Sequence, residues 1–220
     1  MPRKLRQFVP DQTLHVVRRG NNRCDCFFAP EDHALYLSLL VRFAEETGCL
    51  VHAYVLMTNH VHLLMTPRNV DSASRCMHRL GLTYSKSINR KYRRTGTLWE
   101  ERFHASAVAT DAYAIECHRY IELNPVRAGI VDYPADYRWS SHSSNAGIEP
   151  FGWIAAHPSI LALGATRLEA ARCYRALFTN PIDELTLAEL RSQRPLPPGT
   201  TYVPRTGGQP DANCSSANRA

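Results

Sequence analysis

Hydrophobic and polar positions repeat in two different periods along the first two thirds of the chain, and the change of period predicts an order of elements. Apolar runs, some of them alternating with polar residues, predict strands at 14–18, 50–57, 60–66 and 103–109. Apolar residues three or four positions apart predict helices at 32–46 and 70–92, and a later helix capped by Asp111. The order β-α-β-β-α-β, followed by a helix, is the split βαβ arrangement of a ferredoxin-like antiparallel sheet. We therefore expect an α+β fold with helices on one face of the sheet.

The composition of the chain changes after about residue 145. Serine-rich sequence leads into Gly147 and Pro150, and short helical patterns follow. The last stretch is rich in proline, glycine and serine and has little to bury. For a chain of 220 residues, one main domain with an appendage is the natural division. We predict a main domain at 1–145, a small helical C-terminal segment at 146–192 and a disordered tail at 193–220.

Positive charge is concentrated in one stretch of the chain. The formal net charge is +6 and the isoelectric point is about 9.0. Between residues 75 and 94 there is no acidic residue, and the basic residues are Arg75, Arg79, Lys86, Arg90, Lys91, Arg93 and Arg94. Such a surface favours a polyanionic partner that presents phosphates. The alternative is an ordinary solvated helix face.

The remaining composition points to a cytoplasmic protein. The seven cysteines are scattered without a CxxC pair, which argues against a structural zinc site. No apolar h-region follows the first residues, and no apolar run approaches the length of a membrane span. We expect free thiols in a reducing cytosol and no membrane partner.

Two histidines stand out in the strand at 60–66. His60 and His62 flank Val61, and alternate side chains of a strand point to the same face. Two imidazoles on one rigid face are a good start for a divalent metal site, with oxygen ligands from elsewhere. Such a mixed nitrogen and oxygen site suits Mn²⁺, and Mg²⁺ less well. The alternative is a half-buried strand whose histidines make ordinary hydrogen bonds.

A tyrosine and an asparagine lie one helical turn apart in the last predicted helix. Tyr120 and Asn124 share a face if the segment is helical, and Pro125 predicts a kink at Asn124. Such a kink could aim the amide oxygen of Asn124 at a metal. Arg119 and Arg127 add charge for phosphate binding. The alternative is a helix end anchored by an aromatic ring.

Four blocks of sequence together resemble the REP-associated tyrosine transposases, a group of the insertion-sequence family of single-tyrosine transposases within the HUH endonucleases. The blocks are MTNHVHLL at 57–64, GTLWEERF at 96–103, RYIELNPVRAG at 119–129 and YRWSS at 137–141. They occur in family order and spacing between about residues 14 and 141. The His-x-His pair alone is a weak signal, whereas the four blocks together are specific.

The resemblance implies a metal-dependent cut in single-stranded DNA near hairpin-forming palindromes. His60 and His62 match the metal-binding histidines, Tyr120 matches the nucleophile, and Asn124 occupies the position of a third ligand. The cut would leave a 5′-phosphotyrosine, with Mg²⁺ or Mn²⁺ as cofactor and a monomer or homodimer as the active species. Besides the basic stretch, the residues expected to contact DNA are Arg18, Arg102, Arg119 and Arg127.

Three other functions stay open from the sequence. A replication initiator or relaxase would use the same chemistry, but it usually brings a helicase or a larger chain. A catalytically inactive descendant could only bind hairpins, against which the intact His60, His62 and Tyr120 argue. An unrelated metal hydrolase would need further histidine or acidic ligands at a spacing that the chain lacks.

Overall fold

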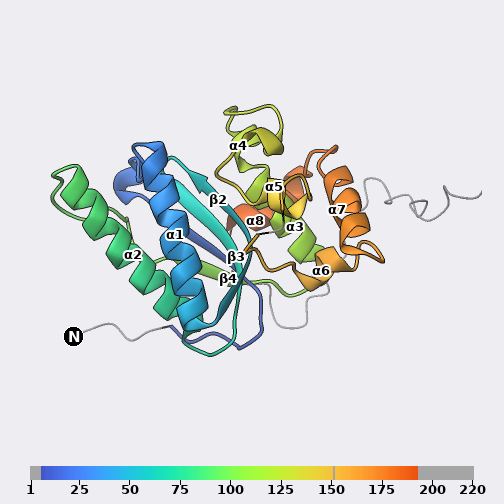
Figure 1. Cartoon of the computed structure of the whole chain (residues 1–220), viewed down its shortest axis with the longest axis horizontal. Coiled ribbons are helices and arrows are strands. Elements are labelled where there is room, and N and C mark those ends of the chain that lie inside the picture. Colours follow the sequence, from blue (N-terminus) through green and yellow to red (C-terminus); the bar gives the residue numbers. More distant parts are fainter. Residues whose placement is uncertain (1–5, 151, 193–220) are drawn as a thin grey trace, which may run out of the picture.

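The computed structural model describes residues 6–150 and 152–192, and a four-stranded antiparallel sheet forms its centre (Figure 1). The strands run in the order β2-β3-β1-β4, and each neighbouring pair is antiparallel. Their bounds are Leu14–Arg19 for β1, Cys49–Met57 for β2, His60–Pro67 for β3 and His104–Ala107 for β4. This topology confirms the predicted ferredoxin-like α+β fold. The last strand is shorter than predicted, because only four of its residues pair with β1.

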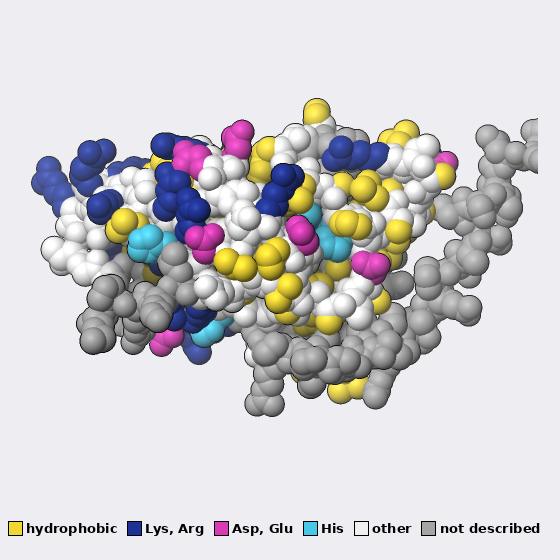
Figure 2. Space-filling model, turned by 90° about the horizontal axis from the view of Figure 1, so that it is seen from below, with side chains coloured by type: hydrophobic (Ala, Val, Ile, Leu, Met, Phe, Trp, Pro, Cys, Tyr) yellow, Lys and Arg dark blue, Asp and Glu magenta, His cyan; other side chains and the backbone are white. Residues whose placement is uncertain are grey.

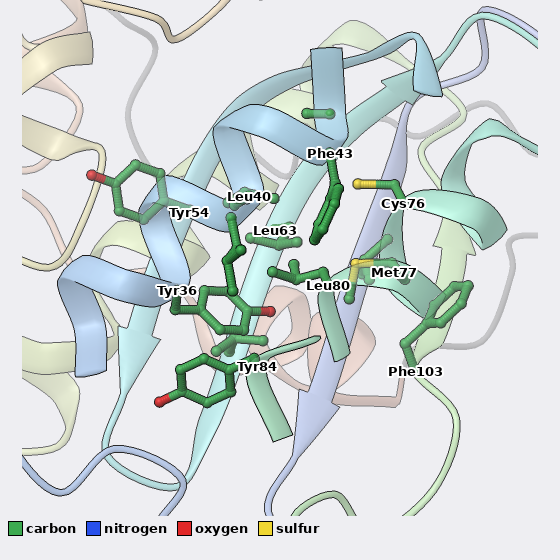
Figure 3. Close-up of a cluster of buried hydrophobic side chains, with 14 of the residues drawn as sticks. Tyr36, Leu40, Phe43, Tyr54, Leu63, Cys76, Met77, Leu80, Tyr84 and Phe103 are labelled. Atoms are coloured by element: carbon green, nitrogen blue, oxygen red, sulfur yellow. The ribbon is translucent and has the colours of Figure 1, made fainter. Parts of the chain in front are cut away.

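Helices α1 (Pro30–Thr47) and α2 (Ser72–Lys91) cover one face of the sheet, as predicted. Their apolar positions recur every three or four residues, so each helix turns one stripe toward the strands. Figure 3 shows this core, in which Leu40 and Phe43 of α1 meet Met77 and Leu80 of α2 above Leu63 of β3. The core fixes the sheet from one side and leaves its other face for a third helix.

Helix α3 (Asp111–Glu122) packs on the opposite face of the sheet. Ala114, Cys117 and Ile121 lie in one hydrophobic cluster with residues of β2 and β3. The predicted cap at Asp111 is wrong. The N-cap is Thr110, whose hydroxyl accepts a hydrogen bond from the Tyr113 backbone N–H, while Asp111 is the first helical residue.

The predicted kink after α3 is present. Helix α3 ends at Glu122, and one further turn, α4, spans Asn124–Arg127 with Pro125 near its start. Proline tolerates this position because the first residues of a helix have no intrahelical partner for their N–H groups. Asn124 and Arg127 are therefore presented by a separate turn directly after the helix that carries Tyr120.

The C-terminal segment packs beside α3. Besides the one-turn 3-10 helices Asn21–Arg23 and Pro134–Asp136, the chain forms α5 (His142–Asn145), α6 (Pro158–Leu161), α7 (Arg167–Ala176) and α8 (Glu184–Ser192). Ile182, Leu187 and Leu190 join the hydrophobic cluster under α3. The predicted helical accessory segment at 146–192 is thus built against the main domain. The predicted disordered tail at 193–220 lies outside the described residues.

A fully buried carboxylate joins α3 to this segment. The two Glu122 carboxylate oxygens accept hydrogen bonds from Ser141 Oγ at 2.6 Å, Asn145 Nδ2 at 2.8 Å and Tyr174 Oη at 2.7 Å, and His142 Nδ1 lies 2.9 Å from Oε2. A buried carboxylate without partners would be costly, so this network ties α3 to residues far along the chain. The backbone of 139–141 also pairs with the outer edge of β2, which explains part of the YRWSS block.

Candidate active site

The register of β1 and β3 defines one face of the sheet, here called the histidine face. His60 and His62 lie on it, and Arg19 and Val17 of β1 stand directly opposite them. Opposed residues of neighbouring strands share a face, so Arg19 lies beside His60 whereas Arg18 points to the α1 and α2 side. The sequence suggested Arg18 as a DNA contact and gave no role to Arg19.

Tyr120 of α3 packs directly over the histidine face. Its ring centroid lies 5.5 Å from that of His62, with the ring planes at 81°. Tyr120 is only 6% exposed and His62 only 3%. Residues 58 positions apart in the sequence are thus in contact, and the predicted pairing of the histidines with Tyr120 is realised in the fold.

A third histidine, which the sequence did not single out, lies in this cluster. His15 of β1 is 1% exposed, and its Nε2 lies 2.9 Å from Nδ1 of His62. Its ring also meets the edge of Tyr120, with 5.7 Å between the ring centroids. A signal was available, because His15 interrupts the apolar run of 14–17 and is the only polar residue within it.

Both candidate metal-binding histidines have one ring nitrogen engaged and the other open. Nδ1 of His60 lies 2.6 Å from Asn59 Oδ1, and Nδ1 of His62 faces His15. Within the described residues neither Nε2 atom has a hydrogen-bond partner. Metal-binding histidines are typically held in this way, by a hydrogen bond at the nitrogen that does not bind the metal.

The spacing of the two imidazoles fits one shared ion. Their ring centroids are 5.1 Å apart with planes at 81°. Two imidazoles bound at about 2.1 Å to a single ion at roughly a right angle would have centroids about 5 Å apart. No group of three His, Cys, Asp or Glu side chains among the described residues could hold a metal, so further ligands would have to be oxygen donors of another kind.

The three clustered histidines are uncharged at neutral pH. Burial, and then the positive charges of Arg19 and Arg127, lower the pKa of His60 to about 4. Burial also lowers the pKa of His15 to about 4 and holds the pKa of His62 well below its usual range. Neutral imidazole is the form that binds a metal ion, so these side chains need not lose a proton first.

Asn124 is buried beside the predicted nucleophile. Its Nδ2 donates to the backbone carbonyl of Tyr120 at 2.9 Å. The amide nitrogen therefore fixes the side chain to the residue that it would assist, and Oδ1 is the atom suited to a hard cation. The alternative of a plain helix end also accounts for this hydrogen bond, so the ligand role of Asn124 stays a prediction.

Three arginines surround the site. The Arg127 guanidinium lies over the Tyr120 ring, 4.4 Å from its centroid, and the side chain is exposed. Arg19 and Arg23 line an open cleft of about 320 Å³ together with Asn59 and His60. Guanidinium groups bind phosphate through paired N–H donors, so the cleft has the chemistry to hold a DNA backbone next to the histidines.

The predicted DNA-contacting residues are distributed unevenly. Exposed basic side chains on or just after α2 are Arg75, Lys86, Arg90, Lys91 and Arg93, and blue side chains gather at one end of the molecule in Figure 2. Four of the seven basic residues between 75 and 94 have intramolecular partners: Arg75 pairs with Asp71, Arg79 with Glu46 and Lys91 with Asp32, and Arg94 covers the Phe28 ring. Arg119 is buried, pairs with Glu116 at 2.8 Å and donates to the Asn180 carbonyl, so it faces the protein interior. Arg18 and Arg102 line a separate pocket.

Comparison with known proteins gives the class of this chain. Residues 8–124, more than half of the chain, match the family model described as IS200-like transposase. The chain therefore belongs to the IS200-like transposase family, which confirms the single-tyrosine transposase family that its motifs predicted. No curated protein sequence matches the chain.

One solved structure shows the same fold, and a second is less similar. A REP-associated tyrosine transposase bound to a REP hairpin is 18% identical, covers 70% of this chain and 92% of its own, and superposes with a TM-score of 0.56. A candidate transposase from Deinococcus radiodurans is 21% identical over 55% of this chain and 95% of its own, with a TM-score of 0.39. Among the described residues, no helix has both the length and the apolar character to cross a bilayer.

Proposed function

We propose that this transposase cuts and rejoins single-stranded DNA through Tyr120, with a divalent ion held by His60 and His62. The observation that carries the proposal is the contact of Tyr120 with His62, beside two imidazoles whose Nε2 atoms are open. A nucleophile must lie within reach of the group that polarises its target, and the fold packs the two together.

The chain's own residues supply most of the chemistry. Arg19 and Arg23 would hold the phosphate backbone in the cleft, and Arg127, whose guanidinium lies over the Tyr120 ring, would contact a phosphate next to the nucleophile. Tyr120 Oη then forms a bond to phosphorus as the bond to the 3′-oxygen breaks, which leaves a 5′-phosphotyrosine and a free 3′-OH. When bound, Mg²⁺ or Mn²⁺ would offset charge on the phosphate oxygens. Because the phosphodiester energy is kept in the adduct, attack by a 3′-OH can rejoin strands.

The substrate class follows from the surface and from the family resemblance. We infer that the DNA carries a hairpin, because the motifs resemble REP-associated tyrosine transposases and one such protein of the same fold is bound to a REP hairpin. Exposed basic residues of α2 offer a surface for the phosphate backbone of this DNA. A hairpin-binding protein without activity is the second candidate, and the intact cluster of His60, His62 and Tyr120 argues against it.

Nicking by histidine variants tests this function. Wild type should nick a hairpin-bearing single strand in Mn²⁺ or Mg²⁺ and stop in excess chelator. His60→Ala/His62→Ala should abolish nicking yet bind the hairpin with nearly unchanged affinity. Leu168→Ala, at an exposed position of α7, is the control and should nick normally. Full nicking by the double variant would contradict the metal site, and nicking unaffected by chelator would contradict the cofactor.

A further inference from the structure

The tight turn between β2 and β3 is clamped by a segment that lies far from it in the sequence. Thr58 and Asn59 form this turn, directly before the first of the two candidate metal-binding histidines. The Thr58 carbonyl accepts a backbone hydrogen bond from Cys26 at 2.9 Å, and the Asn59 carbonyl accepts one from Gly20 at 2.8 Å. The segment 20–27 therefore holds both residues of the turn.

The clamping segment is itself anchored in the core. Phe27 is 2% exposed, and its ring stacks on that of His33 in α1, with 4.2 Å between the ring centroids and 18° between the planes. His33 in turn stacks on Trp139, at 4.7 Å between the centroids. Because Phe27 also donates its backbone N–H to the Thr58 carbonyl at 3.2 Å, this stack braces the turn between the two strands.

The clamping segment contains a turn with an unusual backbone conformation. Asn22 has a φ of 51° and Arg23 a φ of 58°, in the left-handed region that residues other than glycine seldom adopt. Gly20 precedes them, and a Cβ at Gly20 would collide with the Cys24 carbonyl oxygen. Such conformations persist only where the surrounding structure fixes them, and they cluster at functional sites. Here the Arg23 carbonyl accepts a hydrogen bond from the Asn59 side chain, at 3.1 Å from Nδ2.

This hydrogen bond leaves the Asn59 amide only one orientation. A backbone carbonyl can only accept hydrogen bonds, so the Arg23 carbonyl must face the amide nitrogen of Asn59. The amide oxygen Oδ1 then faces Nδ1 of His60, 2.6 Å away. The opposite orientation would place two acceptor oxygens against each other, 3.1 Å apart.

The orientation of the amide in turn fixes one tautomer of His60. Because Asn59 Oδ1 is an acceptor, Nδ1 of His60 must carry the hydrogen, and Nε2 keeps its lone pair. This is the tautomer in which Nε2 can bind a metal ion. His62 differs, because its partner His15 can donate or accept, so their contact at 2.9 Å is compatible with either tautomer. The two histidines are therefore prepared for a metal ion to different degrees.

We propose that Asn59 is a positioning residue, which sets His60 in its metal-binding tautomer before any ion arrives, and that the turn at Arg23 holds Asn59 in place for this role. Asn59 acts through the imidazole of His60. A ligand that already has the required tautomer and ring orientation loses less entropy when it binds. The inference rests on the proposed function, since it concerns the same metal site.

Nitrogen NMR of the metal-free protein tests the inference, because the two tautomers of a histidine have different nitrogen shifts and N–H couplings. In mildly alkaline buffer, His60 of the wild type should carry its hydrogen on Nδ1 alone. Asn59→Ala should show a mixture of tautomers and, in calorimetric titration, bind Mn²⁺ about 10- to 100-fold more weakly. Asn59→Asp keeps an acceptor next to Nδ1, so it should restore the tautomer and bind Mn²⁺ at least as tightly as wild type.

Two control variants separate the Asn59 side chain from the rest of the clamp. Thr58→Ala lies in the same turn at an exposed position, and it keeps the backbone carbonyl to which Cys26 donates, so both the tautomer and the Mn²⁺ affinity should be unchanged. Arg23→Ala removes the guanidinium but keeps the carbonyl that holds Asn59, so the tautomer of His60 should again be unchanged.

Two results would overturn the inference. The first is a wild-type His60 with hydrogen on Nε2 or with a mixture of tautomers, a measurement that requires no variant to fold. The second is a folded Asn59→Ala protein with the wild-type tautomer or the wild-type Mn²⁺ affinity. If wild type forms a Tyr120 adduct in either case, the proposed function stands while the positioning role of Asn59 falls.

Discussion

Replacement of His15 by leucine tests whether this buried histidine orients a metal-binding histidine. The Nε2 of His15 lies 2.9 Å from Nδ1 of His62, and both rings are almost fully buried. Leucine keeps the apolar contact with Tyr120 but removes the hydrogen-bond partner. His62 can then rotate or carry its proton on the nitrogen that should bind the metal.

The expected loss follows from this geometry. Removal of a hydrogen bond that orients a metal-bound histidine typically lowers metal affinity 10- to 100-fold, about 1.4 to 2.7 kcal/mol. Because the Nδ1 of His62 is buried and water would not replace the lost partner, we expect His15→Leu to lower the affinity for the metal ion by about 100-fold. The same unpaired nitrogen should cost about 1–3 kcal/mol of folding stability.

Calorimetric titration with Mn²⁺ in the absence of DNA measures this effect directly, and urea unfolding measures the stability. His15→Gln, whose amide can approach the same nitrogen, should recover part of the affinity. His78→Leu, an exposed histidine on α2, should bind Mn²⁺ as wild type does. An unchanged Mn²⁺ affinity of a folded His15→Leu protein would refute the orienting role.

Three further predictions follow from other parts of the molecule. Lys86→Gln and Arg90→Gln should each reduce the slope of log affinity for single-stranded DNA against log salt by roughly 0.7, and an unchanged slope would mean that both face only solvent. Glu122→Ala should lower the free energy of unfolding in urea by about 3–5 kcal/mol, because four polar groups lose a buried partner, whereas exposed Glu189→Ala should cost little. His118→Leu should flatten the loss of stability on acidification. Burial, and then the charges of neighbouring histidines, hold the pKa of His118 well below 6.5. The unfolded chain therefore binds more protons than the folded chain below pH 6.5, and the free energy of unfolding falls as the pH falls. If His118→Leu loses as much free energy of unfolding between pH 7 and pH 5 as wild type does, measured by urea titration, the prediction is contradicted.

The sequence predicted those parts of the site that depend on local periodicity. The period of two in β3 placed His60 and His62 on one face, and the period of 3.6 with Pro125 placed Asn124 on its own turn after Tyr120. These patterns are local, and the fold preserves them.

Residues whose position depends on tertiary packing were not predictable in the same way. Strand β1 is central and apolar on both faces, so its pattern does not say which residue points where. His15 and Arg19 were therefore missed, and Arg18, which the sequence suggested as a DNA contact, lies on the other face of the sheet from His60 and His62. Arg119 looked available in the sequence, but its pairing with Glu116 and the carbonyl of Asn180 exists only because the C-terminal segment packs on α3.

Peptide mapping of a covalent DNA adduct tests the central claim most directly. Wild-type protein, incubated with Mn²⁺ and a hairpin-bearing single strand, should retain a DNA fragment through the 5′ end of that fragment. Mass spectrometry should place the adduct on the peptide that contains Tyr120, and Tyr120→Phe should be folded, bind the DNA and form none. An adduct on another residue, such as Tyr113, or nicking without any adduct would contradict the account.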